Sequence, residues 1–181
     1  MAVVTAREKL VDTAERLFYA DGISATGVDA VVREAGVSKP TLYAHFGSKQ
    51  ELVAAVLQAR HERRAAALES AAADGGLAAV FALLGVWHGR AGARGCGFLN
   101  AAAELPDPAC APRAVIAAEK VWLEALLERL ARAAGHADPA TAASQLLLLV
   151  DGVSGRVVVH GPAAAPAALA DATAAAERLL A

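Results

Sequence analysis

Residues 37–52 read VSKPTLYAHFGSKQEL, and this stretch decides which fold the chain adopts. Ser38 is a typical helix N-cap. Pro40 follows in the first turn, where the N–H groups have no intrahelical partner anyway. Gly47 ends this helix after only a few residues, and a Ser/Glu capping box over 48–51 begins the next one. The pattern predicts a very short helix followed at once by a long one.

Two more helices are predicted ahead of this stretch. The first begins at a capping box formed by Thr5 and Glu8 and runs to residue 21, with apolar residues recurring at helical spacing. The second begins near Thr26, which has the spacing of a cap with Asp29, and ends at Gly36. Only residues 36–38 connect the second helix to the third, which is the connection of a helix-turn-helix.

In a helix-turn-helix, the second of the two helices enters the major groove of DNA with its N-terminal end leading. Ser38, Lys39 and Thr41 are polar and lie near that end, where they can reach base edges or phosphates. A plain helical bundle with ordinary caps is the alternative interpretation. A helix this short stabilises little by itself, however, which favours a surface that meets a partner.

The charge balance excludes a protein that is basic all over but allows a local basic face. Lys and Arg number 17 against 19 Asp and Glu, for a net charge of −2. Arg33, Lys39 and Lys49 are opposed only by Glu34 between residues 33 and 49. If each copy neutralises about four phosphates, a dimer would show a salt slope of roughly −7. Useful affinity therefore calls for a dimer and a palindromic site.

The rest of the chain also predicts helices, so we expect an all-α fold. The fourth helix runs from 48 to about 73, where Asp74-Gly75-Gly76 breaks it. Five further helices are expected over 77–91, 98–105, 112–134, 139–159 and 165–180. We expect a helix-turn-helix DNA-binding domain over 1–47, with the helix from 48 as the connection, and a larger helical bundle over 48–181.

Several functional classes find no support in the sequence. No phosphate-binding loop, nucleophile elbow or zinc-binding histidine pair is present, which argues against an enzyme, a cofactor or a metal site. Cys96 and Cys110 carry no redox-motif spacing, so structural thiols are preferred over a redox switch. The N-terminus lacks signal-peptide character, and the apolar run 146–150 is too short to span a bilayer. We expect a cytoplasmic protein with no membrane partner.

The segment over residues 7–57, with its core GVSKPTLYAHFGSK, resembles the N-terminal domain of the TetR/AcrR family of bacterial transcriptional regulators. The resemblance implies a homodimer that binds double-stranded operator DNA and is released by a small-molecule effector. A repressor is expected; an activator, or a ligand-binding member without specific DNA recognition, is the alternative. Together with Arg33, whose charge is noted above, the residues to which the resemblance assigns DNA contact are Thr26, Ser38, Lys39, Pro40, Thr41, Tyr43, His45 and Lys49.

The resemblance also implies a ligand pocket among the middle helices. Large aromatics and one polar pair are the candidates for its lining: Phe81, Trp87, Phe98, Asn100, Glu104 and Trp122. Core packing is the alternative for the aromatics, and a solvated helix end is the alternative for the polar pair. Because alanines surround these positions, an apolar effector is expected.

The stretch QLLLLVDGVSGRVVVH over 145–160 is apolar nearly all round, which a solvent-facing helix would not be. The family packs its last two long helices into a four-helix dimer bundle, so this stretch is the expected interface. A buried central helix of the monomer is the alternative, and both can hold on different faces. The expected interface residues are Leu147, Val150, Gly152, Ser154, Val158 and Leu179.

Overall fold

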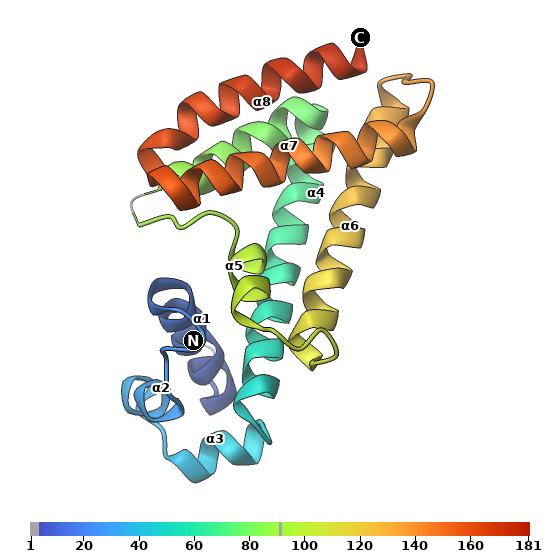
Figure 1. Cartoon of the computed structure of the whole chain (residues 1–181). Helices are drawn as coiled ribbons and strands as arrows, with labels where there is room; N and C mark the ends of the chain where they lie inside the picture. The colour runs from blue at the N-terminus through green and yellow to red at the C-terminus, as the bar shows by residue number, and fades with distance from the viewer. Residues whose placement is uncertain (1–3, 91) are drawn as a thin grey trace. The chain divides into compact units, whose positions relative to one another are not determined.

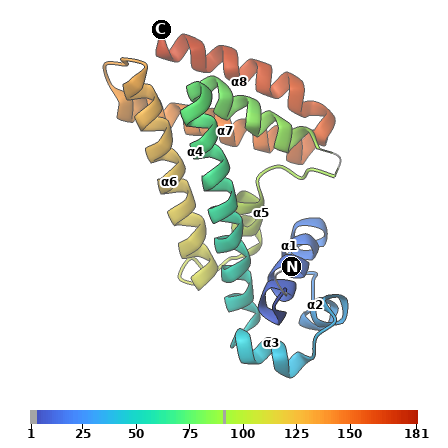
Figure 2. The same cartoon turned by 180° about the vertical axis from the view of Figure 1, so that it is seen from behind.

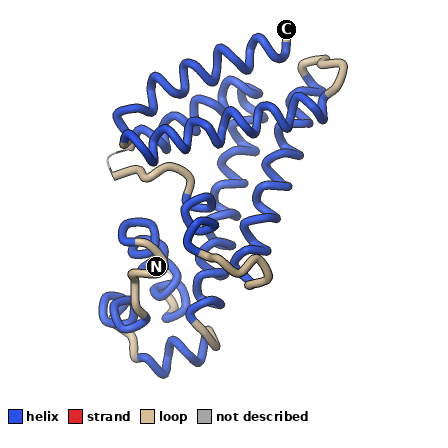
Figure 3. The backbone as a smooth tube through the Cα atoms, in the orientation of Figure 1, coloured by secondary structure: helices blue, strands red, loops and turns tan. Residues whose placement is uncertain are grey.

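The computed structural model describes residues 4–90 and 92–181; the first three residues of the predicted DNA-binding domain and the last residue of the helix predicted over 77–91 lie outside it. Throughout the described residues the regular structure is helical, which confirms the all-α prediction (Figure 3). The elements are α1 Ala6–Asp21, α2 Val28–Ala35, α3 Lys39–His45, α4 Lys49–Gly89, α5 Gly97–Glu104, α6 Ala111–Ala133, α7 Pro139–His160, a short 3-10 helix Pro162–Ala164, and α8 Ala165–Leu180.

Within α4 the backbone leaves helical geometry at two glycines. Gly75 has φ −156° and ψ 22°, and Gly76 has φ 61° and ψ −146°. The positive φ of Gly76 is a conformation that other residues adopt only with strain. α4 is therefore two helices separated by a kink, at the break that the Asp-Gly-Gly sequence predicts.

The chain divides into two compact units. The first contains Met1–Glu62 and Gly97–Ala117, and the second contains Arg63–Cys96 and Ala118–Ala181. α5 therefore packs with the N-terminal helices although more than thirty residues of the second unit precede it in sequence. The division predicted after residue 47 is a functional one and stays a prediction.

In the first unit, α1, α2 and α3 pack on one another around apolar side chains. Leu10, Ala14 and Leu42 are 0% exposed, and Phe46 is 3% exposed. α1 begins at the predicted capping box, in which the Thr5 hydroxyl and the Glu8 carboxylate each take a backbone N–H of the other residue. These buried positions follow the helical period of the sequence and hold α3 against its neighbours.

The turn over residues 22–26, which leads into α2, is held by hydrogen bonds from three directions. Lys49 Nζ donates to the carbonyl of Ile23 at 2.6 Å, and the N–H of Ser24 donates to Glu104 Oε2 at 2.8 Å. Within the turn, Thr26 Oγ1 donates to the carbonyl of Gly22 at 2.7 Å. Two charged side chains, one from α4 and one from α5, therefore fix the turn that places the helix-turn-helix.

The second unit contains α7 and α8 lying side by side (Figures 1 and 2). Its core is mainly leucine, valine and alanine from the second half of α4, the later part of α6, α7 and α8. α8 contributes mostly small residues, of which Ala168, Ala172 and Ala176 are buried. Small side chains at this spacing let the two helices approach closely.

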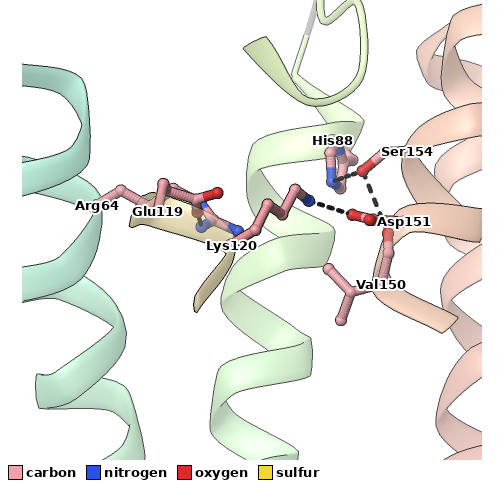
Figure 4. A network of polar contacts seen from close by, with 7 residues as sticks. All are labelled: Arg64, His88, Glu119, Lys120, Val150, Asp151 and Ser154. Carbon is pink, nitrogen blue, oxygen red and sulfur yellow. Dashed lines mark hydrogen bonds and ion pairs between the residues drawn. The ribbon is translucent and has the colours of Figure 1, made fainter. Parts of the chain in front are cut away.

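A group of polar side chains interrupts the apolar interior of the second unit (Figure 4). Ser154 Oγ and His88 Nε2 lie 3.2 Å apart, and Ser154 also donates to the carbonyl of Val150. Arg64 pairs with Glu119, and Lys120 pairs with Asp151. Burial lowers the pKa of His88 below its usual value, with a further contribution from the Arg64 charge.

Two helices, α4 and α7, are long and apolar enough to cross a membrane by length and composition alone. The five-residue run considered above was too short, but the whole of α7 is not. This is weak evidence for a membrane span, because core helices of soluble proteins pass the same test.

Replacing Lys49 should weaken the fold through the turn that it holds. Lys49→Gln removes the charged donor from the partly buried Ile23 carbonyl, and we expect the free energy of unfolding to fall by about 1 kcal/mol in urea titrations. Lys9→Gln, a change at an exposed position of α1, is the matched control and should stay within about 0.5 kcal/mol of wild type. Equal effects of the two substitutions would contradict a structural role for Lys49.

The stability of the protein should fall as the pH drops below about 6.5, the ordinary histidine pKa. The lowered pKa of His88 means that the unfolded chain takes up a proton there before the folded protein does, so protons favour unfolding in that range. The loss is at most about 1.4 kcal/mol per pH unit and ends at the folded-state pKa. Urea titrations between pH 7.5 and 5.5 should show a smaller pH dependence for His88→Gln, whereas His45→Gln, at an exposed site, should match wild type.

Candidate nucleic-acid interface

The short helix α3 is built as its sequence predicts. Ser38 is the N-cap, with its hydroxyl accepting from the Thr41 N–H at 3.2 Å, and Pro40 lies in the first turn. Leu42 is fully buried, so the opposite side of the helix faces outward. Gly36, with φ 66°, ends α2 in the left-handed conformation and turns the chain toward α3.

Most residues predicted to contact DNA have exposed side chains on α2 and α3. Tyr43 is 46% exposed, an unusual exposure for a large aromatic side chain. Thr41 is half-buried, and its hydroxyl lies 2.7 Å from that of Ser38. The other predicted residues with exposed side chains are Arg33, Ser38, Lys39, Pro40 and His45.

Lys39 is paired within the protein. Its Nζ lies 2.9 Å from Asp29 Oδ1, which belongs to the first turn of α2. The hydrogen bond that Lys39 donates to Asp29, and then the charge of Asp29, raise the pKa of Lys39 above its usual value. The sequence predicts Asp29 only as part of a helix cap, and its pairing with Lys39 was not expected. The available signal was its acidic charge near the expected cations Arg33, Lys39 and Lys49.

Two other predicted contact residues make hydrogen bonds within the protein. Thr26 is 5% exposed, and its hydroxyl is committed to the carbonyl of Gly22. It does not cap α2, whose N-cap is Gly27 with no side-chain hydrogen bond. Lys49 donates to the carbonyl of Ile23. Thr26 is buried and Lys49 is half-buried, and in this conformation both side chains stabilise the turn. Their contact with DNA stays a prediction.

The six residues predicted to line a ligand pocket are divided between the two units. Phe81 is buried in the core of the second unit, where Trp87 and Trp122 pack partly buried against it. In the first unit Phe98 is fully buried. Asn100 and Glu104 line a small cavity of about 30 Å³ there.

This cavity is bordered by α1, α4 and α5, with apolar side chains such as Phe18 and Val56 at its walls. Its volume suits one or two water molecules and is far below the roughly 300–1,000 Å³ of sites for drug-sized ligands. Glu104 is also engaged with Ser24, so a structural role accounts for one member of the predicted polar pair.

The predicted interface residues also separate by burial. Val150 and Ser154 are 4% and 1% exposed and face the interior of the second unit, which removes them from any surface that a second copy could contact. Gly152 and Val158 are exposed, whereas Leu147 and Leu179 are half-buried. Leu148 and Val159, which were not predicted, are 70% and 73% exposed.

The two cysteines form no disulfide in the described part of the chain. Cys96 and Cys110 are both free thiols, one half-buried in the second unit and one buried in the first. No group of three His, Cys, Asp or Glu side chains that could hold a metal ion is found among residues 4–90 and 92–181.

Comparison with known proteins agrees with this geometry. The family described as "Bacterial regulatory proteins, tetR family" matches residues 10–56. Among solved structures, a TetR-family transcriptional regulator from Streptomyces coelicolor is 32% identical, with 97% of this chain and 96% of that chain aligned at a TM-score of 0.89. A putative regulator of the same type from Streptomyces avermitilis is 34% identical over 96% and 98% of the two chains, with a TM-score of 0.79.

Curated relatives match only the N-terminal part. The transcriptional activator FasR of Mycolicibacterium smegmatis is 51% identical over 55 residues, and the transcriptional regulator TtgR of Pseudomonas putida is 39% identical over 56. These matches span 25% and 27% of the two relatives, so they concern the DNA-binding region alone. The match to the Streptomyces structures covers nearly the whole of both chains. The chain therefore belongs to the TetR family and is a DNA-binding transcriptional regulator.

Proposed function

We propose that the protein is a homodimeric repressor that binds a palindromic operator and is released from it by a small, mainly apolar effector. The observation that carries this proposal is the exposed polar surface of α3 opposite the fully buried Leu42. A helix of seven residues held by its buried side presents its N-terminal end to a partner without needing to fold on contact. Family membership supports DNA as that partner.

The proposed contacts are those side chains of the predicted set that are exposed. Lys39, Pro40 and Thr41 lie at the leading end of α3, where side chains reach base edges or phosphates. Tyr43 and His45 lie further along and suit backbone contacts. We assign residues 1–47 to DNA binding and 48–181 to ligand binding and dimerisation, with the α5 segment as a C-terminal contribution to the DNA-binding unit.

We propose that a second copy packs on the outer surface of α7. Leu148, Gly152, Gly155 and Val159 recur at i, i+4, i+7 and i+11, which places them on one side of the helix. Both glycines are open, since a methyl group added at either would meet nothing within 4 Å. We call these four residues the α7 stripe. An apolar surface with small residues suits close packing of a partner helix, and a two-fold dimer matches a palindromic operator.

Activation of transcription is the second candidate, and one observation favours considering it. FasR, which is 51% identical to this chain over 55 residues, is an activator. The DNA-binding surface does not decide whether transcription is activated or repressed, because that depends on the position of the operator relative to the promoter. Deleting the gene and measuring transcripts of its neighbours separates the two: levels rise after loss of a repressor and fall after loss of an activator.

Fluorescence anisotropy with the DNA upstream of the protein's own gene tests the proposed function. We expect specific binding that weakens with salt, at a slope no steeper than about −7, since Lys49 is engaged within the protein. Tyr43→Ala should weaken binding by about tenfold, the effect of roughly one charge-assisted contact. Arg129→Ala, an exposed change in the second unit, is the control. Salt-independent binding, or equal affinities for Tyr43→Ala and wild type, would contradict the proposal.

Removing the charge of Asp29 should strengthen DNA binding. Asp29→Asn releases Lys39 from its ion pair and removes an anion that repels phosphates. We expect the affinity for both operator and unrelated DNA to rise several-fold at low salt, with the larger gain for unrelated DNA. Asp74→Asn makes the same charge change at the kink of α4 and should leave both affinities unchanged. An unchanged or lower affinity for Asp29→Asn would show that Asp29 positions Lys39 productively.

Charges on the α7 stripe should separate the two copies. We expect Leu148→Asp with Val159→Asp to shift the mass measured by light scattering from dimer to monomer and to lower operator affinity by at least tenfold. Val121→Asp places the same charge on α6, at a valine that is 68% exposed, and should remain dimeric. A doubly substituted protein that stays dimeric would place the interface elsewhere.

A further inference from the structure

The carboxylate of Glu119 on α6 is an unusual group for the interior of a helical bundle. Its side chain is 0% exposed. Arg64 binds Oε1, whereas Oε2 has no hydrogen-bond partner anywhere in the described part of the chain. Buried carboxylate oxygens are nearly always paired, because an unpaired one loses its water without compensation. Oε2 is therefore an acceptor that a donor from a bound molecule could satisfy.

The charges around Glu119 determine whether a neutral or a charged donor fits best beside it. Arg64 neutralises the carboxylate and lies with its guanidinium 5.8 Å from the centre of the Trp87 ring. His88, close enough to feel the Arg64 charge, is kept neutral by its lowered pKa. The ion pair of Lys120 with Asp151 is balanced as well (Figure 4). We call Arg64, His88, Glu119, Lys120, Asp151 and Ser154 the cluster. It therefore carries no net charge, although it is rich in polar atoms.

The cluster is connected to the surface of the second unit. The Arg64, Lys120 and Asp151 side chains are 12%, 19% and 30% exposed, in contrast to Glu119. Trp87 and Trp122 are only partly buried and offer flat apolar surface in the same unit. The charged side chains around Glu119 are therefore partly open to solvent, and their flexible stems tolerate displacement.

We propose that Oε2 of Glu119 accepts a hydrogen bond from the effector, and that the effector is an uncharged, mostly apolar molecule carrying an O–H or N–H group. This inference rests on the proposed function in one respect, that a small molecule controls DNA binding. It adds the chemistry that the ligand needs. The six residues predicted from sequence included no group that selects for a donor at this position.

The electrostatics separate this ligand class from charged ones. A cation at Oε2 would lie close to the Arg64 guanidinium, and both cations would interact with the single carboxylate of Glu119. Repulsion from Arg64 would therefore offset the attraction of the cation to Glu119. An anion would meet the unpaired carboxylate oxygen directly. A neutral donor gains a hydrogen bond to a charged acceptor at low desolvation cost, while its apolar body gains from burial.

Isothermal titration calorimetry with matched probes tests the proposal on the full-length protein without DNA. 4-Ethylphenol carries an O–H donor, 4-ethylanisole replaces it by a methyl ether, and 4-ethylbenzylamine is a cation of similar size. We expect the phenol to bind at least tenfold more tightly than the ether, a difference of about 1.4 kcal/mol. The amine should bind more weakly than the phenol.

Two variants connect the preference to Glu119. Glu119→Gln keeps the size of the side chain but, with its amide oxygen on Arg64, presents N–H groups where Oε2 stood, so the phenol preference should fall below threefold. Glu124→Gln changes the same residue type on the same helix at a half-buried position outside the cluster and should keep the preference. Thermal unfolding confirms that each variant is folded, and if Glu119→Gln is not, Glu119→Asp, which withdraws the carboxylate, should lower the phenol preference instead.

Three outcomes would overturn the proposal. Equal affinities for phenol and ether would show that Oε2 selects no donor, and tighter binding of the amine would assign a cation to the site. Binding of no probe at millimolar concentration would leave a buried water molecule as the partner of Oε2. Operator binding is measured separately: if the phenol binds with the expected preference but does not weaken the DNA complex, the donor site stands and its role as effector site fails.

Discussion

The proposed DNA-binding surface depends on a single constraint: α3 is too short to be a stable helix by itself. Seven residues form few intrahelical hydrogen bonds, and the cost of nucleating the helix exceeds what they return. Leu42 and Phe46 supply the missing stability, because both are almost fully removed from water against the neighbouring helices. The polar side chains on the other side of α3 are therefore held in place by the packing of Leu42 and Phe46, to which they do not themselves contribute.

Much of the fold follows from the sequence because the signals are local. Capping boxes, turn glycines and helical periodicity place α1, α3 and the start of α4 correctly, and the Asp-Gly-Gly break appears as the kink at Gly75 and Gly76. The start of α2 does not follow from the local sequence in this way. Thr26 has the spacing of a cap, but a nearer backbone carbonyl takes its hydroxyl, and no property of the local sequence distinguishes the two outcomes.

The candidate sites were harder to predict than the fold, because they depend on contacts between distant residues. Lys49 reaches the carbonyl of Ile23, 26 residues earlier, so a cation that looked available for DNA is engaged inside the protein. The burial of Glu119, by contrast, is predictable from the sequence. This residue lies four residues before Leu123 on the apolar side of α6, where the helical period already predicts burial, and a carboxylate at such a position calls for a partner. Its choice of Arg64 could not be read from the sequence.

The way the chain returns to its first unit has a consequence for engineering. Residues 97–117 pack with the N-terminal helices, and Glu104 holds the turn at Ser24 that places α2. The DNA-reading part is thus discontinuous in sequence. Joining only the first sixty residues to the sensor of another regulator would leave that turn without its carboxylate anchor. A chimera that keeps this turn intact therefore has to carry the α5 segment together with the helix-turn-helix, so the first unit is inherited as two separate stretches of sequence rather than one.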